Sequence, residues 1–308
     1  MTDEPTAGPE VPPRKFCVFV LSHGRAGRVR TIDSLRAGGY TGTWYVVVDN
    51  EDATVQDYVA RYGRDRVIVF DKLAVSRTFD TADLSEDRRA VVFARNACFD
   101  IARDLGMTHF LELDDDYQKL EQRYGENGKL MYAYAKDLDA AFAAMLDFLD
   151  TSGAASVAFG QGGDLVGGLG SRRWEAKVLR KAMNTFFCRT DSDWRFVGRV
   201  NEDVNTYTTL SHRGRLFFTT LYATVKQGVT QANPGGMTDL YRTDGTYAKS
   251  FYPVMMCPSA VKVSMLSSSH ARIHHKIDWN ACAPKIVPES WRKWTPPPMS
   301  ADSPHVTR

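Results

Sequence analysis

Three consecutive aspartates, Asp114, Asp115 and Asp116, directly follow a short, mostly apolar run over 109–113. Adjacent carboxylates repel one another, so a folded protein keeps them together where a positive charge compensates. Mg²⁺ and Mn²⁺ supply that charge, because they prefer oxygen ligands and leave positions for substrate phosphates. The first and third residues of such a turn can face one side, so we predict Asp114 and Asp116 as metal ligands. A solvated acidic turn is the alternative.

A second acidic pair, Glu202 and Asp203, stands at the start of a predicted short helix over 202–211. One of these carboxylates can act as a general base that takes the proton of an attacking hydroxyl group. Acidic residues are also favoured in the first turn of a helix, where they complement its positive end. The spacing alone leaves both interpretations open.

The segments that must position these groups alternate between strand-like and helix-like patterns. Continuous apolar runs, typical of strands buried on both faces, occupy 16–21, 44–48, 66–70 and 109–113. Helical spacing of apolar residues predicts helices over 89–105 and 136–150. Strands that alternate with helices predict a mainly parallel sheet.

The carboxyl ends of these four strands all carry polar residues. They are residues 22–25, Asp49 with Asn50, Asp71, and the three aspartates. Ligands of such sheets bind outside the carboxyl ends of the strands, so this edge is the predicted site. Later strands are predicted over 155–159, 184–189, 216–225 and 260–266, with mixed pairing. The predicted fold class is therefore α/β with a mixed central sheet.

The composition is that of an ordinary globular protein, with 308 residues and a formal net charge of +2. Proline-bearing ends predict disordered tails over 1–14 and 290–308, around a single domain over 15–289. The five cysteines are scattered and never spaced as C-x-x-C, so no disulfide framework or zinc site is predicted. The first residues carry no secretory signal, and no apolar run approaches the ~20 residues of a membrane span. We therefore expect a cytoplasmic protein with no membrane partner.

Two sets of motifs resemble a known group of enzymes. The segment ARNACFDIARDLG (94–106), followed by HFLELDDDY (109–117), resembles the GT-A superfamily of glycosyltransferases over residues 15–117. The later segments GGMTDLYRTDGTYAKSFYPVMMCPSAVKV (235–263) and RIHHKIDWNACAPKI (272–286) resemble the TET-associated glycosyltransferase family of phages and bacteria. The resemblance covers most of the chain between its tails and implies a single GT-A domain with a D-x-D metal turn.

The resemblance implies that a sugar passes from a UDP-sugar to 5-hydroxymethylcytosine in double-stranded DNA, with Mn²⁺ or Mg²⁺ as the cofactor. It implies metal ligation by Asp114 and Asp116, and by a late histidine, with His274 preferred over His270 and His275. It also places the reaction in the cytoplasm, that of the host if the protein is phage-encoded.

The resemblance further implies a set of contacts to the donor sugar nucleotide. They are made by Arg25, Asp49, Arg95, Asp114 and Asp115. Each arginine also has the ordinary interpretation of a solvated surface residue. At the acidic pair the resemblance favours Asp203 as the base of an inverting transfer, with Glu202 in reserve, because similar pairs place a carboxylate beneath the acceptor.

Basic residues interleaved with aromatic ones occupy the middle of the chain. They are Arg172, Arg173, Trp174, Lys177, Arg180 and Lys181, followed by Arg189, Trp194, Arg195, Phe196 and Arg199. Such residues suit a phosphate backbone and an extruded base, and the resemblance favours this interpretation over a charged helix face. The preceding glycine-rich segment, 160–170, matches no ATP or NAD loop pattern, and both a mobile lid and a surface loop are open.

Three other functions are compatible with parts of the sequence. One is a GT-A glycosyltransferase that acts on a protein or polysaccharide acceptor. Another is a catalytically inactive GT-A-shaped module that binds DNA, although an inactive module need not keep clustered, repelling carboxylates. The third is a nucleotidyltransferase with a related sheet, whose basic loop the segment His23 to Arg28 resembles only loosely.

Overall fold

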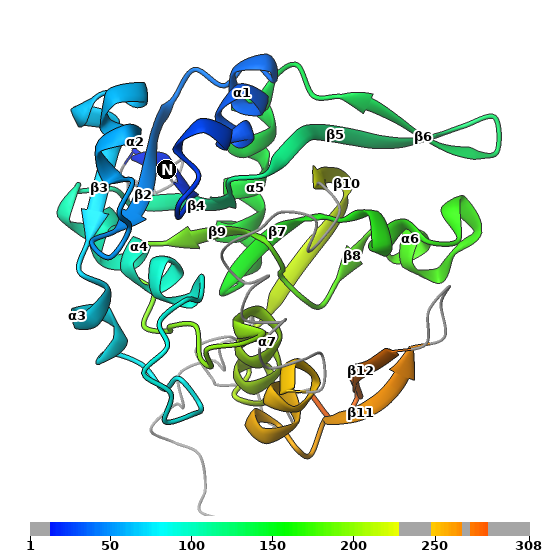
Figure 1. Cartoon of the computed structure of the whole chain (residues 1–308). Helices are drawn as coiled ribbons and strands as arrows, with labels where there is room; N and C mark the ends of the chain where they lie inside the picture. The colour runs from blue at the N-terminus through cyan, green and yellow to red at the C-terminus, as the bar shows by residue number, and fades with distance from the viewer. Residues whose placement is uncertain (1–12, 228–247, 267–271, 283–308) are drawn as a thin grey trace, which may run out of the picture.

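The computed structural model describes residues 13–227, 248–266 and 272–282, which form an α/β domain around a large mixed sheet (Figure 1). The strand order is β3-β2-β1-β4-β9-β7-β10-β5-β6, and β8 pairs with β10. The strands are β1 (Phe16–Leu21), β2 (Thr43–Asp49), β3 (Val67–Phe70), β4 (His109–Asp114), β5 (Tyr117–Glu126), β6 (Lys129–Tyr134), β7 (Ser156–Gly160), β8 (Val178–Leu179), β9 (Thr185–Arg189) and β10 (Phe217–Gln227). The predicted fold class, α/β with a mixed central sheet, is confirmed.

The first four strands run parallel and bring the predicted polar ends to one edge. Strand β1 lies between β2 and β4, with Leu21 paired to Val47 on one side and to Asp114 on the other. Asp49, at the end of β2, pairs with Phe70 of β3. The chain leaves β1, β2 and β3 for helices, whereas β4 passes through the aspartate turn directly into β5.

Helices cover both faces of this sheet, which explains why its central strands are apolar throughout. The helices are α1 (Arg30–Ala37), α2 (Val55–Tyr62), α3 (Lys72–Ser76), α4 (Val92–Asp104), α5 (Leu138–Ser152), α6 (Arg172–Ala176) and α7 (Glu202–His212). Side chains of α1, α2 and α5 share one core with Val18 and Val20 of β1. Side chains of α4 and α7 share the other core with Phe19 and Leu21.

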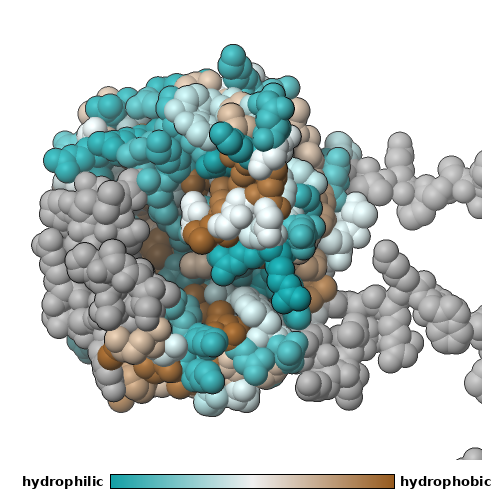
Figure 2. Space-filling view, turned by 90° about the vertical axis from the view of Figure 1, so that its right-hand side faces the viewer, coloured by the Kyte–Doolittle hydropathy of each residue, from teal (hydrophilic) through white to brown (hydrophobic). Residues whose placement is uncertain are grey.

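The second half of the sheet is mixed. Strand β9 runs antiparallel to both β4 and β7, and β10 pairs in parallel with β7 and antiparallel with β5. Strands β5 and β6 form a long hairpin that projects from the body of the domain (Figure 1). We call this hairpin, residues 117–134, the arm. Seen from the arm side, the face of the molecule is hollowed and carries both polar and apolar residues (Figure 2).

A small C-terminal unit lies beside α7. It contains a helix over 248–256 and a separate two-stranded sheet of β11 (Val261–Leu266) and β12 (Arg272–Ile277). Its Trp279 ring stacks on Tyr207 of α7, with ring centres 5.7 Å apart. This sheet is not paired with the large one, and contacts such as the hydrogen bond from the Asn201 side-chain amide to the Lys249 carbonyl, at 2.7 Å, join the unit to the domain.

The predicted strands and the three predicted helices are all present, with shifts of a few residues at their ends. The arm was not predicted, because its outer residues are solvent-exposed and form no apolar run. The predicted tails lie outside the described residues except for residues 13 and 14, and Arg14 pairs with Asp147 and Asp150 of α5. The domain boundaries therefore stay a prediction.

Candidate active site

The aspartate turn is held in place by α1. Thr31 uses its hydroxyl twice, donating to the Asp114 carbonyl at 2.5 Å and accepting from the Tyr117 backbone N–H at 3.0 Å. The Thr31 N–H donates to the Asp115 carbonyl at 3.3 Å, and the Ser34 hydroxyl donates to the Tyr117 carbonyl at 2.8 Å. The turn is therefore fixed through its backbone, which leaves the three carboxylates available for other contacts.

The three carboxylates point in different directions. Asp115 is buried at 4% exposed and accepts hydrogen bonds from the Ser22 hydroxyl at 2.6 Å and from Arg25 Nη1 at 3.1 Å. Asp114 and Asp116 are only partly buried. Burial, reinforced by the charge of Asp114, raises the pKa of Asp116 to about 6. The first and third carboxylates thus stay open to a ligand, while the middle one is used inside the protein.

Behind the turn, the guanidinium of Arg95 lies among three carboxylates. Arg95 Nη2 donates to Asp114 at 3.0 Å, Arg95 Nε donates to Glu202 at 3.0 Å, and Glu112 lies 3.6 Å away. Arg95 is 2% exposed and rests on the Phe186 ring, 4.7 Å from its centre. Predicted as a donor contact, Arg95 instead lies at the back of the turn, where its charge is shared among protein groups.

One positive charge does not neutralise three negative ones in a buried space. Glu112 is fully buried, and burial raises its pKa well above the ordinary value. Burial and the neighbouring Asp203 raise the pKa of Glu202 to about 7. The cluster of Arg95, Glu112, Asp114 and Glu202 therefore keeps an excess of negative charge when its carboxylates ionise.

The predicted base residues begin α7, after Asn201 in a left-handed conformation. Asp203 Oδ1 accepts a hydrogen bond from the Val204 N–H at 2.7 Å, and Asp203 is 9% exposed. Burial raises the pKa of Asp203. Through Arg95, the fold connects Glu202 to Asp114, so the two acidic motifs of the sequence belong to one site.

A second charged cluster lies at the ends of β1 and β2. Asp49 Oδ2 accepts from His23 Nδ1 at 2.7 Å and lies 3.2 Å from Lys72 Nζ. Burial alone would raise the pKa of Asp49, but the His23 hydrogen bond and the Lys72 charge outweigh it and lower that pKa. Asp52 accepts from the Gly24 N–H at 2.7 Å and so fixes the loop that carries Arg25.

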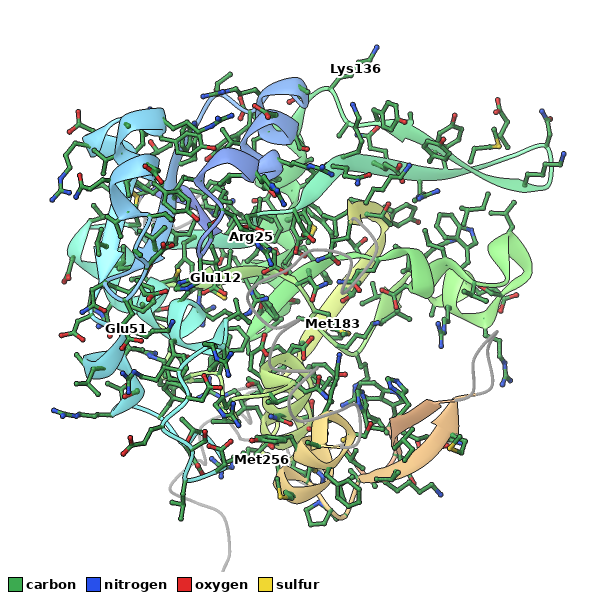
Figure 3. The ribbon with its side chains drawn as sticks, viewed as in Figure 1. Arg25, Glu51, Glu112, Lys136, Met183 and Met256 are labelled. Carbon is green, nitrogen blue, oxygen red and sulfur yellow. The ribbon has the colours of Figure 1, made fainter. Side chains whose placement is uncertain are left out.

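This loop and α2 border an open hollow of about 720 Å³. The residues that line it are Gly24 to Arg28, Thr54, Asp57, Ala60 and Arg61. Arg25 thus lies between the hollow and Asp115. Figure 3 places Arg25 and Glu112 near the centre of the molecule and Glu51 farther out.

His274 lies on β12, opposite Ser264 of β11, and its ring centre is 4.2 Å from that of His275. Within the described ranges, the side chains that converge as a possible metal site are those of His212, Cys257 and Cys282. In those ranges His274 forms no such group with the aspartates. His270 lies outside the described residues. Ligation of the metal by a late histidine therefore stays a prediction.

The interpretation of the basic run as a nucleic-acid surface is wrong for Trp194, Phe196 and Arg199, which are buried. Trp194 and Phe196 are buried in the core beside α4, where they contact Phe99. Arg199 is 5% exposed and pairs with Asp83 at 2.8 Å. These aromatics and arginines alternate in the sequence because the segment packs against α4.

The first part of that run is different. Arg172 and Arg173 of α6 are exposed, and Lys177 Nζ lies 3.9 Å from the centre of the Trp174 ring. The glycine-rich segment before it forms two short 3-10 turns, η3 (Gly162–Leu165) and η4 (Gly168–Gly170). Buried Asp164 pairs with Lys181, which anchors this segment to the domain.

Several site residues had escaped the sequence analysis. They are Asp52, Lys72, Glu112 and Tyr58, whose hydroxyl hydrogen-bonds with Ser22 at 2.8 Å and accepts from the Arg25 N–H at 2.8 Å. Glu112 is the most informative, because a charged residue inside the apolar run HFLEL signals a buried ion pair or a functional group. Lys72 carries a weaker signal, since one lysine after a strand is ordinary.

A sequence comparison agrees with the two acidic motifs lying together at one edge of the sheet. The family described as TET-Associated Glycosyltransferase matches residues 16–236 of the chain. The chain belongs to this family. The predicted enzyme class, a glycosyltransferase, is thereby confirmed. Among curated proteins, none matches the chain.

Three solved structures show a weak likeness to the chain, each with a TM-score below 0.5. Glucosyl-3-phosphoglycerate synthase from Mycobacterium tuberculosis, in complex with Mn²⁺, UDP and phosphoglyceric acid, is 11% identical with a TM-score of 0.44, over 86% of this chain and 87% of that one. The complex of that synthase with Mg²⁺ and UDP is 10% identical, with a TM-score of 0.45 over 86% and 88%. S. aureus TarS 1-349 is 16% identical, with a TM-score of 0.38 over 68% and 60%. None of the helices among the described residues of this TET-associated glycosyltransferase has the length and apolar character to cross a membrane.

Proposed function

We propose that this glycosyltransferase moves a sugar from a UDP-sugar to 5-hydroxymethylcytosine in double-stranded DNA, with Mn²⁺ or Mg²⁺ as its cofactor. Family membership supports the reaction class. The observation that carries the proposal is the aspartate turn, where Asp115 is turned inward while Asp114 and Asp116 stay partly open. The setting that we propose is the cytoplasm, that of the host if the protein is phage-encoded.

The residues of the turn fit a hard divalent cation. Asp114 shares Arg95 with two other carboxylates, and Asp116 accepts a hydrogen bond from the neutral amide of Gln227 at 3.3 Å. Carboxylate oxygens with uncompensated charge are the ligands that Mg²⁺ and Mn²⁺ prefer. When bound there, such an ion supplies positive charge to the diphosphate that leaves.

We assign the donor diphosphate to the loop after β1. The Arg25 side chain is 23% exposed and is held by Asp115, so its guanidinium is positioned before a donor arrives. Asp49 is buried at 4% exposed and acts through His23, whose side chain is 43% exposed. A positioned arginine and a protonated histidine suit a diphosphate, because both donate charge-assisted hydrogen bonds.

For an inverting reaction we assign the base to Asp203. Glu202 Oε1 is held by Arg95, whereas Asp203 uses Oδ1 on its own helix and keeps Oδ2 for an acceptor. The acceptor hydroxyl oxygen bonds to the anomeric carbon, its proton passes to Asp203, and the bond between that carbon and UDP breaks. The raised pKa of Asp203, caused by burial, makes it a stronger base than an ordinary aspartate.

The arm supports a nucleic-acid acceptor. Tyr132 and Tyr134 of β6 are 50% and 47% exposed, and each faces a basic residue of β5. Arg123 lies 5.0 Å from the Tyr132 ring centre, and Lys119 lies 4.9 Å from that of Tyr134. Aromatic rings beside cations suit unstacked bases and phosphates.

The position of the arm also suits a duplex whose target base has been flipped out. Strand β5 begins at Tyr117, directly after the turn, and Glu121 pairs with Tyr134. At about 3.4 Å per residue, Tyr134 lies about 17 Å along the strand from Asp116. Gly125 of the arm packs against Leu169 of η4, so the exposed arginines of α6 follow beside it. A flipped base reaches the turn while the duplex rests on this surface.

The test is release of UDP from UDP-glucose and from UDP-N-acetylglucosamine in the presence of Mn²⁺, with hydroxymethylcytosine DNA and with unmodified DNA. We expect release that hydroxymethylcytosine DNA stimulates and that Asp116→Ala reduces by about 10²- to 10³-fold. Asp33→Ala is the matched control, because Asp33 is an exposed aspartate of α1.

The outcomes separate the parts of the proposal. Metal-dependent release that ignores DNA keeps the glycosyltransferase and rejects the DNA acceptor. If Asp116→Ala and Asp33→Ala release UDP at equal rates, the assignment of the metal to the aspartate turn is rejected. Binding of DNA without release from either donor rejects both donors and favours the inactive module.

A further inference from the structure

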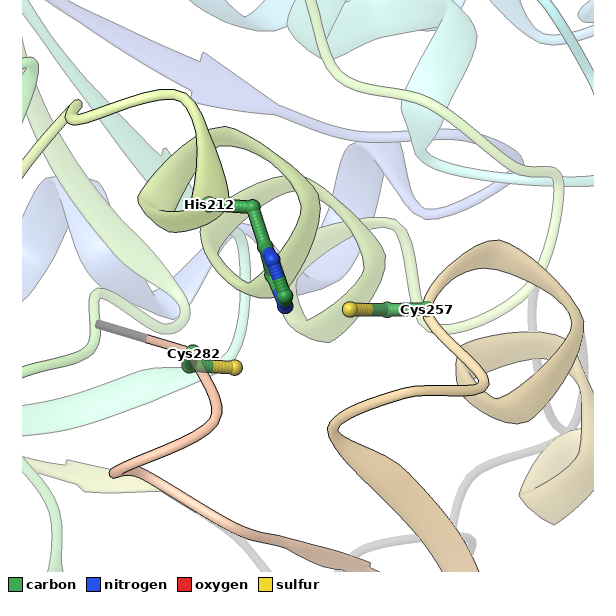
Figure 4. A group of neighbouring side chains, drawn as sticks. All are labelled: His212, Cys257 and Cys282. Atoms are coloured by element: carbon green, nitrogen blue, oxygen red, sulfur yellow. The ribbon is translucent and has the colours of Figure 1, made fainter. Parts of the chain in front are cut away.

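Three side chains that can ligate a metal converge on the far end of α7 (Figure 4). His212 is the last residue of α7, Cys257 follows the helix over 248–256, and Cys282 lies in the turn after β12. Their ligand atoms all lie within 4.8 Å of one another. In Figure 4 the two sulfur atoms point toward the imidazole from opposite sides.

The chemistry of this group is that of a zinc site. Two thiols and one imidazole are soft and borderline donors, which select Zn²⁺ over Mg²⁺ or Mn²⁺. With Zn–S bonds of about 2.3 Å, tetrahedral geometry places ligand atoms about 3.5 to 3.8 Å apart. Side-chain rotations close the remaining gap from 4.8 Å, and the fourth position is left for water or another side chain.

The small buried core of the C-terminal unit is an independent reason to place a metal there. Among the described residues, the fully buried part of its apolar cluster is four small residues, Cys257, Ala260, Val261 and Cys282, with Val254, Ile277, Trp279 and Ala281 packed against them. A two-stranded sheet is marginally stable by itself, and a unit with so small a core is commonly stabilised by a metal or disulfides. Two of the four core residues are the cysteines of the group.

The other cysteines show that this arrangement is particular to one place. Cys17, Cys98 and Cys188 are buried in the core between the sheet and α4, and in the described ranges they join no metal-capable group. The sequence conceals the group, because its ligands come from three segments and lack the C-x-x-C spacing.

We infer that His212, Cys257 and Cys282 hold a structural Zn²⁺ ion that fastens the C-terminal unit to α7. This site is separate from the proposed cofactor site, because α7 carries Glu202 and Asp203 at its first turn and His212 at its last. The ion ties residues 248–282 to the helix whose other end enters the active site. It does not take part in the transfer.

The test is the zinc content of the full chain after purification, measured by mass spectrometry of the metals. We expect about one Zn²⁺ per chain in the unaltered protein, and loss of that ion in Cys257→Ala, Cys282→Ala and His212→Ala. Cys17→Ala is the matched control and keeps the ion. His212→Ala is the decisive variant, because His212 is exposed and its replacement leaves the packing intact.

A second measurement keeps the inference testable if the cysteine variants fail to fold. Co²⁺ added to the metal-free chain should give the sulfur-to-cobalt absorption of a tetrahedral thiolate site, and His212→Cys should keep that absorption while His212→Ala weakens cobalt binding at least tenfold. The inference is overturned by a folded chain that binds neither Zn²⁺ nor Co²⁺, by equal zinc in all variants, or by a disulfide between Cys257 and Cys282.

Discussion

The two charged clusters of the site treat their carboxylates in opposite ways. At the ends of β1 and β2, Asp49 and Asp52 lie beside two groups of positive or potentially positive charge, His23 and Lys72. Behind the turn, Arg95 alone serves Glu112, Asp114 and Glu202. The first cluster is balanced by the protein and can hold its geometry without a ligand. The second is balanced only when a cation or protons arrive, which is expected where a metal and a base work.

The largest expected difference between the clusters is in stability. Arg95→Met leaves the buried Glu112 and Glu202 and the partly buried Asp114 without their counter-charge, and we expect the free energy of unfolding to fall by about 3–5 kcal/mol. Lys72→Met leaves Asp49 with His23 as a partner, so the free energy of unfolding of this variant should fall by clearly less. Urea denaturation of both variants at one pH measures the difference, and equal losses would contradict the comparison.

We expect the catalytic base beside the cluster behind the turn, because Asp203 follows Glu202 in the first turn of α7. Asp203→Asn keeps the size and the hydrogen bond to Val204 but cannot take a proton, so we expect kcat to fall by about 10²-fold with little change in KM. Glu202→Gln should have a smaller effect on kcat, because Glu202 is held by Arg95. Initial rates with saturating donor measure both variants, and the reverse order would move the base to Glu202.

The arm is the part of the proposed acceptor surface that lies away from both clusters. Replacing Tyr132 and Tyr134 by alanine should weaken binding of hydroxymethylcytosine DNA by about 1–3 kcal/mol per stacked base. The same change should leave DNA-independent hydrolysis of the UDP-sugar unaltered, since the rings lie about five residues along the hairpin from the turn. Met255→Ala is the control, because the Met255 side chain is exposed. Tyr45→Ala is not suitable, because the Tyr45 ring packs on Phe19. Equal DNA affinity in the arm variant would exclude the arm from the acceptor surface.

The last expected difference concerns pH. The pKa of Glu202 is raised to about 7 in the folded state from an ordinary 4.5. The folded state therefore gains stability from protonated Glu202 that is complete below pH 4.5 and is lost as the pH rises through 7. In Glu202→Gln the free energy of unfolding should fall less between pH 5 and 8 than in the unaltered protein. Urea denaturation in a chelating buffer measures this, with exposed Glu175→Gln as the control, and parallel curves would refute it.

The sequence predicted the parallel half of the fold because its strands are buried on both faces and read as apolar runs. It also predicted that the ends of those strands meet, which brought Asp49, Arg25 and the aspartate turn to one edge. It did not predict that Arg95 lies behind the turn, because the partners that bury it, Glu112 and Glu202, are 17 and 107 residues away. The arm escaped because its side chains face water, and a half-exposed hairpin has no apolar signature.

The two basic segments show that similar composition can go with opposite burial. Residues 189–199 and 172–177 share a composition, yet the first packs its aromatics against Phe99 while the second exposes its arginines. The composition of a segment gives the kinds of residue that it contains. Whether their side chains are buried depends on which other elements the fold packs against that segment. The metal-capable group at His212 shows this again, because its three ligands become neighbours only through the packing of α7.

The place of β9 between β4 and β7 has a consequence for synthesis of the chain. Strand β4 pairs with β9 through Leu113 and Thr185, and Thr185 is made 72 residues after its partner. At about 5–20 residues per second, a ribosome takes roughly 4 to 14 s to cover that distance. During this interval β4 is an apolar strand with one unpaired edge, which is a template for aggregation. A nascent chain of this enzyme should therefore depend most on chaperones between the emergence of β4 and that of β9.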